Sequence, residues 1–235
     1  MFLGHYGLAL AATRVAPRTS LGSLIFAAQF LDLLWPVLLL LGLEQVRIVP
    51  GLMAMSDLDF VSYPISHSFA TTLGWAALVG VATFLRRRDR RAAWVLAALV
   101  ASHWLLDAPM HRPDLPLWPG SGLLVGGGLW NSVAATWALE AGLFVGGIAL
   151  YVRGTRARDR IGHWALWAML ALLAVFFAGA GEPPPSERIL ALVTLTLWLF
   201  IPWGAWISRH REPTHRTPAP HPDPLPEVPH ADSAA

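Results

Sequence analysis

Three residues near the middle of this sequence have types and a spacing that suit metal chemistry: His103, Asp107 and His111. His103 and Asp107 are four residues apart, so an α-helix places them on one face, about 6 Å apart along its axis. Pro109 is expected to end that helix and to leave His111 just beyond it. An imidazole and a carboxylate at this spacing suit a divalent metal ion. The alternative is a buried His–Asp hydrogen bond that only fixes two helices together.

The composition is that of an integral membrane protein. The chain has 235 residues, of which 55% are hydrophobic and 14% charged, and its mean hydropathy is +0.50. Several runs of 18 or more residues are almost free of charge, which is long enough to cross a hydrocarbon core of about 30 Å. The sequence contains no cysteine, which excludes thiolate metal sites and disulfides. Any metal must therefore be bound by histidine, carboxylate or other oxygen ligands.

The hydrophobic runs predict an all-α, polytopic transmembrane bundle. Six full spans are expected, at residues 21–43, 68–85, 92–108, 130–152, 161–179 and 189–207. Residues 2–13 are too short to span and are expected to form a half-helix or re-entrant helix that carries His5 into the membrane. Pro36 is expected to kink the first span. Residues 44–67 are expected to be a loop, and residues 109–129 an ordered loop or a short re-entrant piece. The N-terminus lacks the features of a removable signal peptide.

The arginines predict the orientation of these spans. They gather in alternate loops, at Arg14 and Arg18, in 86–91, in 153–160, and at Arg209 and Arg211, so these loops are expected to be cytoplasmic. Because the net charge is only +2, these arginines are interpreted as topology signals and not as a surface that binds nucleic acid. Membrane lipid is the expected partner. Residues 1–208 are interpreted as the transmembrane domain and residues 209–235 as a disordered, Pro- and His-rich cytoplasmic tail.

Ionisable residues in or beside the predicted membrane segments lie at related depths. Counted at about 1.5 Å per helical residue from the arginine-bearing loops, they extend from mid-membrane to the outer edge. They are His5, Asp32, His67, His103, Asp107 and Glu140. Each one alone is explained by a helix cap or by a pair between neighbouring helices. Together they predict a shared polar cavity, because buried charges in a membrane need partners.

Short motifs around these residues resemble a known family. Over residues 1–150 they are Gly4-His5, Gln29-x-x-Asp32, Ser66-His67-Ser68 and His103-x-x-x-Asp107. This pattern resembles the bacterial inner-membrane metal-dependent hydrolases, a family similar to the zinc phospholipase C and P1 nuclease group. The resemblance implies a divalent metal, zinc above all, a location in the bacterial inner membrane, and hydrolysis of a phosphoester.

Carried over to this sequence, the resemblance implies the metal ligands His5, Asp32, His67, His103 and Asp107. Asp32, His67 and Asp107 are also expected to be catalytic, while His111 and Glu140 are further candidates by position alone.

The leading interpretation is a membrane-embedded, metal-dependent hydrolase that acts on a phosphoester of a lipid-like substrate in the outer half of the membrane. Two non-enzymatic alternatives remain open. One is a carrier that uses the buried His, Asp and Glu side chains as a proton or ion relay. The other is a structural or partner-binding membrane protein in which these groups lock helices together.

Overall fold

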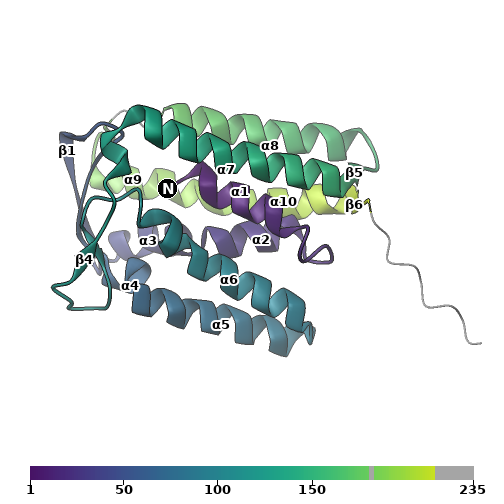
Figure 1. The fold of residues 1–235 in the computed structure, drawn as a ribbon, viewed down its shortest axis with the longest axis horizontal. Helices are drawn as coiled ribbons and strands as arrows, with labels where there is room; N and C mark the ends of the chain where they lie inside the picture. The colour runs from purple at the N-terminus through teal and green to yellow at the C-terminus, as the bar shows by residue number, and fades with distance from the viewer. Residues whose placement is uncertain (180–182, 215–235) are drawn as a thin grey trace, which may run out of the picture.

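Helices that run lengthwise make up most of the chain, as Figure 1 shows. This computed structural model describes residues 1–179 and 183–214. The helices are α1 (Leu3–Ala12), α2 (Leu21–Ala28), α3 (Phe30–Leu40), α4 (Pro64–His67), α5 (Phe69–Arg87), α6 (Arg90–Asp107), α7 (Val133–Gly154), α8 (Arg160–Ala178), α9 (Glu187–Thr194) and α10 (Phe200–Arg209), with 3-10 turns η1 (Leu129–Asn131) and η2 (Leu195–Leu199). The predicted helical fold is confirmed.

Short antiparallel strand pairs lie at the ends of the helices. They are β1 (Gln45–Met53) with β2 (Ser56–Ser62), β3 (Leu115–Pro116) with β4 (Leu124–Val125), and β5 (Thr155–Ala157) with β6 (Arg211–Pro213). The prediction of a plain loop at residues 44–67 is therefore wrong, because this segment folds into the β1–β2 hairpin followed by α4.

Four helical segments of the described chain are long and apolar enough to cross a membrane: α5, α7, α8, and the continuous segment Glu187–Arg209 formed by α9, η2 and α10. The pair α2 and α3 makes a fifth if its two halves count as one span. The predicted total of six is not confirmed, because α6 contains Arg90, Arg91 and Asp107 within its 18 residues. These charges keep α6 below the hydropathy of a full span.

The first predicted span is bent by 57° between α2 and α3. The bend lies at Gln29 and not at Pro36, which is inside α3. At the break, the carbonyl oxygen of Ala28 accepts a hydrogen bond from the Nδ1 of His103, 2.7 Å away. An imidazole on α6 thus supplies a donor to a carbonyl at the end of α2, where a helix leaves such groups without internal partners.

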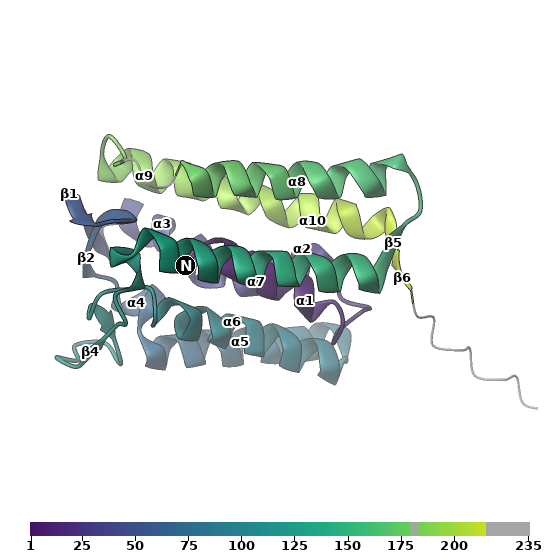
Figure 2. The same ribbon diagram turned by 45° about the horizontal axis from the view of Figure 1, so that its top comes forward.

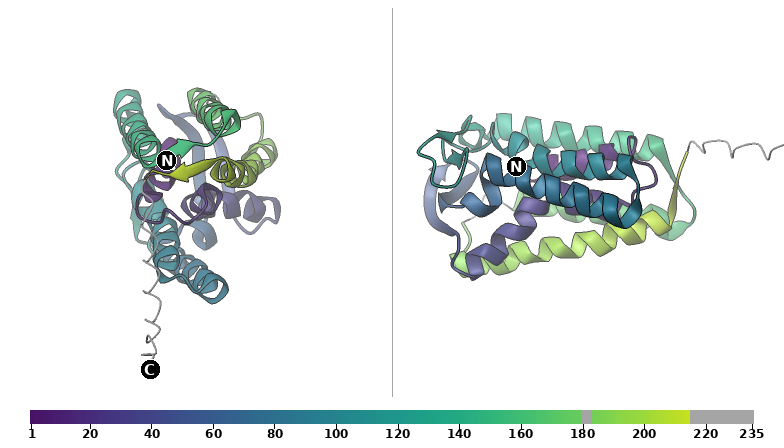
Figure 3. Two further views of the ribbon diagram at one scale, coloured as in Figure 1. Left: turned by 90° about the vertical axis from the view of Figure 1, so that its right-hand side faces the viewer. Right: turned by 90° about the horizontal axis from the view of Figure 1, so that it is seen from below.

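The short helix α1 occupies the middle of the bundle. Figure 2 shows it beside α7 and α2, with α8 and α10 on one side and α5 and α6 on the other. The view along the bundle in Figure 3 places the N-terminus at the centre of the surrounding helices. Gly7 of α1 and Gly147 of α7 let the two backbones touch, since a Cβ on Gly147 would lie 2.1 Å from the Gly7 carbonyl oxygen. The predicted half-helix therefore lies among other helices.

The arginine-bearing loops gather at one end of the bundle. The α1–α2 loop, the α5–α6 turn and the β5–β6 pair lie at the right of Figure 1, and the β1–β2 hairpin and β4 lie at the left. This grouping matches the alternation read from the sequence, while the assignment of that end to the cytoplasm stays a prediction.

The predicted boundary between residues 208 and 209 is wrong. Arg209 belongs to α10, and β6 pairs with β5. The Arg211 side chain donates to the carbonyl oxygen of Gly162 at 3.0 Å and is buried. The ordered part of the chain therefore reaches at least Thr214, and the predicted disorder of residues 215–235, with His215, His221 and His230, lies outside the described residues.

Candidate metal centre

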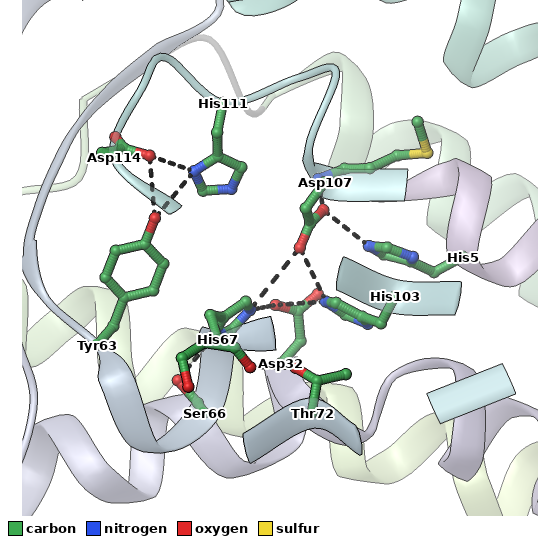
Figure 4. A network of polar contacts seen from close by, with 12 residues as sticks. His5, Asp32, Tyr63, Ser66, His67, Thr72, His103, Asp107, His111 and Asp114 are labelled. Carbon is green, nitrogen blue, oxygen red and sulfur yellow. Dashed lines mark hydrogen bonds and ion pairs between the residues drawn. The ribbon is translucent and has the colours of Figure 1, made fainter. Parts of the chain in front are cut away.

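The structure brings the five predicted metal ligands together at one buried place, shown in Figure 4. They come from four helices: His5 from α1, Asp32 from α3, His67 from α4, and both His103 and Asp107 from α6. The three histidines and Asp107 are almost fully buried, whereas the Asp32 side chain is 21% exposed. Asp32 is therefore the member that borders the outside of the site.

Asp107 and Asp32 face the imidazole nitrogens. The Oδ1 of Asp107 lies 3.2 Å from the Nε2 of His5, and its Oδ2 lies 3.2 Å from the Nε2 of His103. The Oδ1 of Asp32 is 3.6 Å from the Nε2 of both His67 and His103. These atoms form two overlapping groups, His5–His103–Asp107 and Asp32–His67–His103, each with its ligand atoms within 4.8 Å of one another. His103 belongs to both groups, so the arrangement suits one ion or two.

The tautomer of His103 follows from its neighbour on α2. A carbonyl oxygen only accepts hydrogen bonds, so the bond from Nδ1 to Ala28 places the proton on Nδ1. The Nε2 of the neutral ring then presents a lone pair toward Asp107 and Asp32. This Nε2 is buried and has no hydrogen-bond partner among the described residues. A bound cation, or a second proton on Nε2, would offset the negative charge of these carboxylates in a buried site.

His67 is oriented by a chain of hydrogen bonds that ends at Glu44. The Ser66 hydroxyl donates to Oε2 of Glu44 at 2.6 Å, so it accepts the bond from Nδ1 of His67 at 2.7 Å. The Oε1 of Glu44 also accepts the backbone N–H groups of Ile65 and Ser66, both at 2.8 Å. The proton of the neutral ring is thus on Nδ1, and Nε2 again presents a lone pair to the carboxylates. Pro64 at the first position of α4 suits the start of the helix that carries His67.

His5 and the N-terminal amine complete the surroundings of Asp107. The His5 ring stacks on the His103 ring, with centroids 3.7 Å apart and planes within 11°. Its Nδ1 is buried without a hydrogen-bond partner in the described part of the chain. The α-amino group of Met1 donates to Oδ1 of Asp107 at 2.5 Å, so it neutralises part of the charge on that oxygen. The second oxygen of Asp107 remains directed at His103.

Glu140 belongs to α7, and its side chain reaches the start of α1. It lies outside both metal-binding groups. Its Oε1 accepts the backbone N–H of Phe2 at 2.7 Å, and its Oε2 accepts that of Gly4 at 2.8 Å. These are the donors that the N-terminus of a helix leaves free, and a carboxylate there is favoured by the helix dipole. The structure therefore places Glu140 as an anchor for the helix that carries His5.

His111 also lies outside the two groups, in the loop that follows α6. Its Nδ1 donates to Oδ1 of Asp114 at 3.0 Å, and the Tyr63 hydroxyl donates to the same oxygen at 2.9 Å. Burial lowers the pKa of His111 below its ordinary value, against the opposing effect of the Asp114 hydrogen bond. Burial, and then the Asp114 carboxylate, raise the pKa of the Tyr63 hydroxyl. Figure 4 shows Tyr63, His111 and Asp114 beside the metal-binding groups, on the side of Asp107 that faces away from His5.

Sequence reasoning missed Glu44 and Asp114. Both are carboxylates in segments read as loops, and neither belongs to a motif. The only local signal at Glu44 was an acidic residue directly after a long apolar run. Its partners, Ile65 and Ser66, become visible only once the β1–β2 hairpin returns the chain to the end of α3.

The donor set fits a divalent metal ion. Two imidazole lone pairs, a third imidazole and two carboxylates converge, which is the nitrogen and oxygen ligation typical of zinc and related ions. No protein-family model, curated protein or solved structure matches this chain.

Proposed function

We propose that this chain is a membrane-embedded, metal-dependent hydrolase whose ligands are His5, Asp32, His67, His103 and Asp107. The observation that carries the proposal is the orientation of His103 and His67. Both rings hold their proton on Nδ1, through Ala28 and through Ser66, and both turn Nε2 toward carboxylates. A structural His–Asp pair would satisfy the same carboxylates with a second proton on Nε2, so the metal content separates the two arrangements.

A bound divalent ion would supply a Lewis acid that polarises a phosphoryl oxygen and activates water. The protein's own residues have separate roles. Asp107 and His103 hold the inner side of the site, and the Ser66–Glu44 chain keeps His67 in one orientation. Asp32, the partly exposed carboxylate, faces the arriving substrate and is placed to take a proton from water.

The proposed substrate is a phosphoester of a lipid-like molecule. Two features support a substrate from the lipid phase: the site lies in a bundle that contains four helical segments long and apolar enough to span a membrane, and it sits toward the end of the bundle that carries the β1–β2 hairpin. The phosphoester chemistry, zinc and the inner-membrane location rest on the family resemblance of the motifs.

Elemental analysis tests the proposal. The wild-type protein, purified without chelators, is compared with His103→Ala, Asp107→Asn and the control His163→Ala, which removes an exposed histidine at the start of α8. We expect one or two divalent ions per chain in the wild type and the control. His103→Ala should lose them, and Asp107→Asn should lose at least part, because an amide is a poor metal ligand.

Turnover is measured on the same preparations with a phospholipid and a polyprenyl phosphate. Metal-dependent release of phosphate or of a phosphorylated headgroup, absent in His103→Ala, supports hydrolysis. A wild type without metal would overturn the proposal, and a silent Asp107→Asn would favour a purely structural pair. Bound metal without turnover of either phosphoester would support the metal centre and contradict the proposed hydrolysis.

A further inference from the structure

A second polar site lies at the opposite end of the bundle from the metal centre. It is a pocket of about 460 Å³ beside the β5–β6 pair. Its lining includes five arginines from separate segments of the chain: Arg18, Arg87, Arg158, Arg209 and Arg211. They come from the α1–α2 loop, the end of α5, the loop after β5, the end of α10 and β6.

Among the described residues, most of the positive charge in this pocket has no carboxylate partner. Among the described residues that line it, Glu212 is the carboxylate, and it already pairs with Arg156 at 2.6 Å and Arg158 at 3.4 Å. Arg211 is committed to the fold through Thr155 and Gly162. The three remaining arginines, Arg18, Arg87 and Arg209, are exposed and form no ion pair within residues 1–179 and 183–214.

The convergence goes beyond what membrane orientation requires. A topology signal needs arginines in the cytoplasmic loops, and Arg86, Arg88 and Arg153 in the same loops lie outside this pocket. The pocket arginines instead share one cavity, which Ser20 and Ser208 also line. Guanidinium groups that converge on one cavity are typical of sites that bind phosphate groups.

The pocket also lies where lipid phosphates would be found. Arg87, Tyr151 and Arg209 belong to the last turns of α5, α7 and α10, which are parts of three of the candidate spans. The ends of such helices lie at the level of the lipid headgroups.

We propose that this pocket is a binding site for a phosphate group, carried by an anionic lipid or free in solution. The inference is independent of the metal centre. Arg18, Arg87 and Arg209 bind the phosphate oxygens, and Arg158 and Arg211 add to the positive charge of the walls.

Calorimetry on the full chain in a neutral detergent tests this site with three probes: dihexanoyl phosphatidylglycerol, inorganic phosphate, and dihexanoylglycerol, which has no phosphate. The pocket variant is Arg18→Gln with Arg209→Gln. The matched control is Arg86→Gln with Arg153→Gln, which removes the same charge from the same end but outside the pocket. All four side chains are exposed, so both variants should fold.

We expect saturable binding of at least one phosphate probe, one per chain, with no binding of dihexanoylglycerol. The pocket variant should bind about tenfold or more weakly, because each lost charged hydrogen bond weakens binding by roughly that factor. The control should match the wild type. Binding of the lipid alone identifies a headgroup site, and binding of both probes identifies a site for free phosphate as well. Equal weakening in both variants, or no saturable binding of either phosphate probe, would overturn the proposal.

Discussion

At Ser66, the direction of one hydrogen bond decides what His67 can do. The hydroxyl gives its proton to Glu44 and therefore accepts the proton of His67 Nδ1. Without the carboxylate, the hydroxyl could rotate and donate to His67, and the ring would then carry its proton on Nε2, facing the metal centre. Glu44 is thus a positioning residue that acts through Ser66.

Replacing Glu44 by Gln should lower the affinity for metal by about 10- to 100-fold. The amide keeps one acceptor oxygen for the backbone N–H groups of Ile65 and Ser66 but presents an NH2 group to the Ser66 hydroxyl, which then no longer has a carboxylate to donate to, so His67 loses its fixed orientation. The measurement is competition for zinc with a chelator of known affinity. Glu187→Gln is the control, because Glu187 is an acidic residue at the N-terminal turn of α9, outside the metal centre. Equal affinities for the wild type and Glu44→Gln would show that the Ser66–Glu44 chain has no such role.

The buried loop histidine His111 should make stability depend on pH. Its pKa in the folded protein is lowered from the ordinary value of 6.5, mainly by burial, so the unfolded chain binds the proton more readily. Its contribution to stability is therefore full above pH 6.5 and is lost as the pH falls below that value. Thermal unfolding between pH 8 and pH 5 should show a steeper loss for the wild type than for His111→Gln. Parallel curves would mean that His111 titrates alike in both states.

Spacing and depth predicted part of the site at this scale. The i,i+4 rule placed His103 and Asp107 on one face, and related depths grouped them with His5, Asp32, His67 and Glu140, while the choice of five ligands among these came from the motif resemblance. Glu44 escaped because its partners, Ile65 and Ser66, are distant in sequence. Asp114 escaped because its distant partner, Tyr63, meets it only in the folded chain and its local partner, His111, lies in a segment interpreted as a loop.

Among the elements, α1 depends most on contacts with others. It has ten residues, too few to span a membrane, and it packs mainly against α7 and α2. Glu140 of α7 holds its first N–H groups, and Gly7 and Gly147 bring the two backbones into contact. The position of His5 is therefore set by α7.

Gly147→Ala should destabilise the fold by about 1–3 kcal/mol, because the added methyl group overlaps the carbonyl of Gly7. It should also weaken metal binding, since moving α1 moves His5. Gly146→Ala is the matched control: a Cβ there meets nothing within 4 Å, and alanine favours the helix by up to about 1 kcal/mol. Thermal unfolding and zinc competition on both variants provide the comparison. If the two variants had the same stability and the same affinity for zinc, the close approach of α1 and α7 would contribute to neither.

Hydrophobic runs predicted where most helices lie but not how they are interrupted. Pro36 was the natural place for a kink in the first span, yet the chain bends at Gln29, where His103 bonds the Ala28 carbonyl. The contact that accompanies the bend comes from another helix, so no local rule could have located it. The β1–β2 hairpin was missed for a related reason, since its strands carry charged residues that read as a loop.

For the whole molecule, the two ends differ in charge. Arginines gather around the β5–β6 pair, and the metal centre lies toward the β1–β2 hairpin. This polarity was predicted from the alternation of arginine-bearing loops. The convergence of Arg18, Arg87 and Arg209 on one pocket was not, because it depends on how three separate segments pack.

Reporters fused at the two ends should lie on opposite sides of the membrane. A reporter after Thr214 is expected in the cytoplasm, and one in the turn between Met53 and Ser56 is expected on the outer side. Alkaline phosphatase and green fluorescent protein fusions distinguish the two locations. Both reporters on the same side would contradict the proposed orientation and an outward-facing metal centre.

The packing of α1 against α7 also has a consequence for biosynthesis. A ribosome adds about 5–20 residues per second, so Gly147 is made on the order of ten seconds after Gly7. During that interval α1 is an apolar segment without its main partner, and the insertion machinery must shelter it. His103 and Asp107 leave the ribosome before α7 does, but the His5 position is fixed only once α7 is in place. Chains arrested before Val133 should therefore lack a complete site even though every ligand has been synthesised.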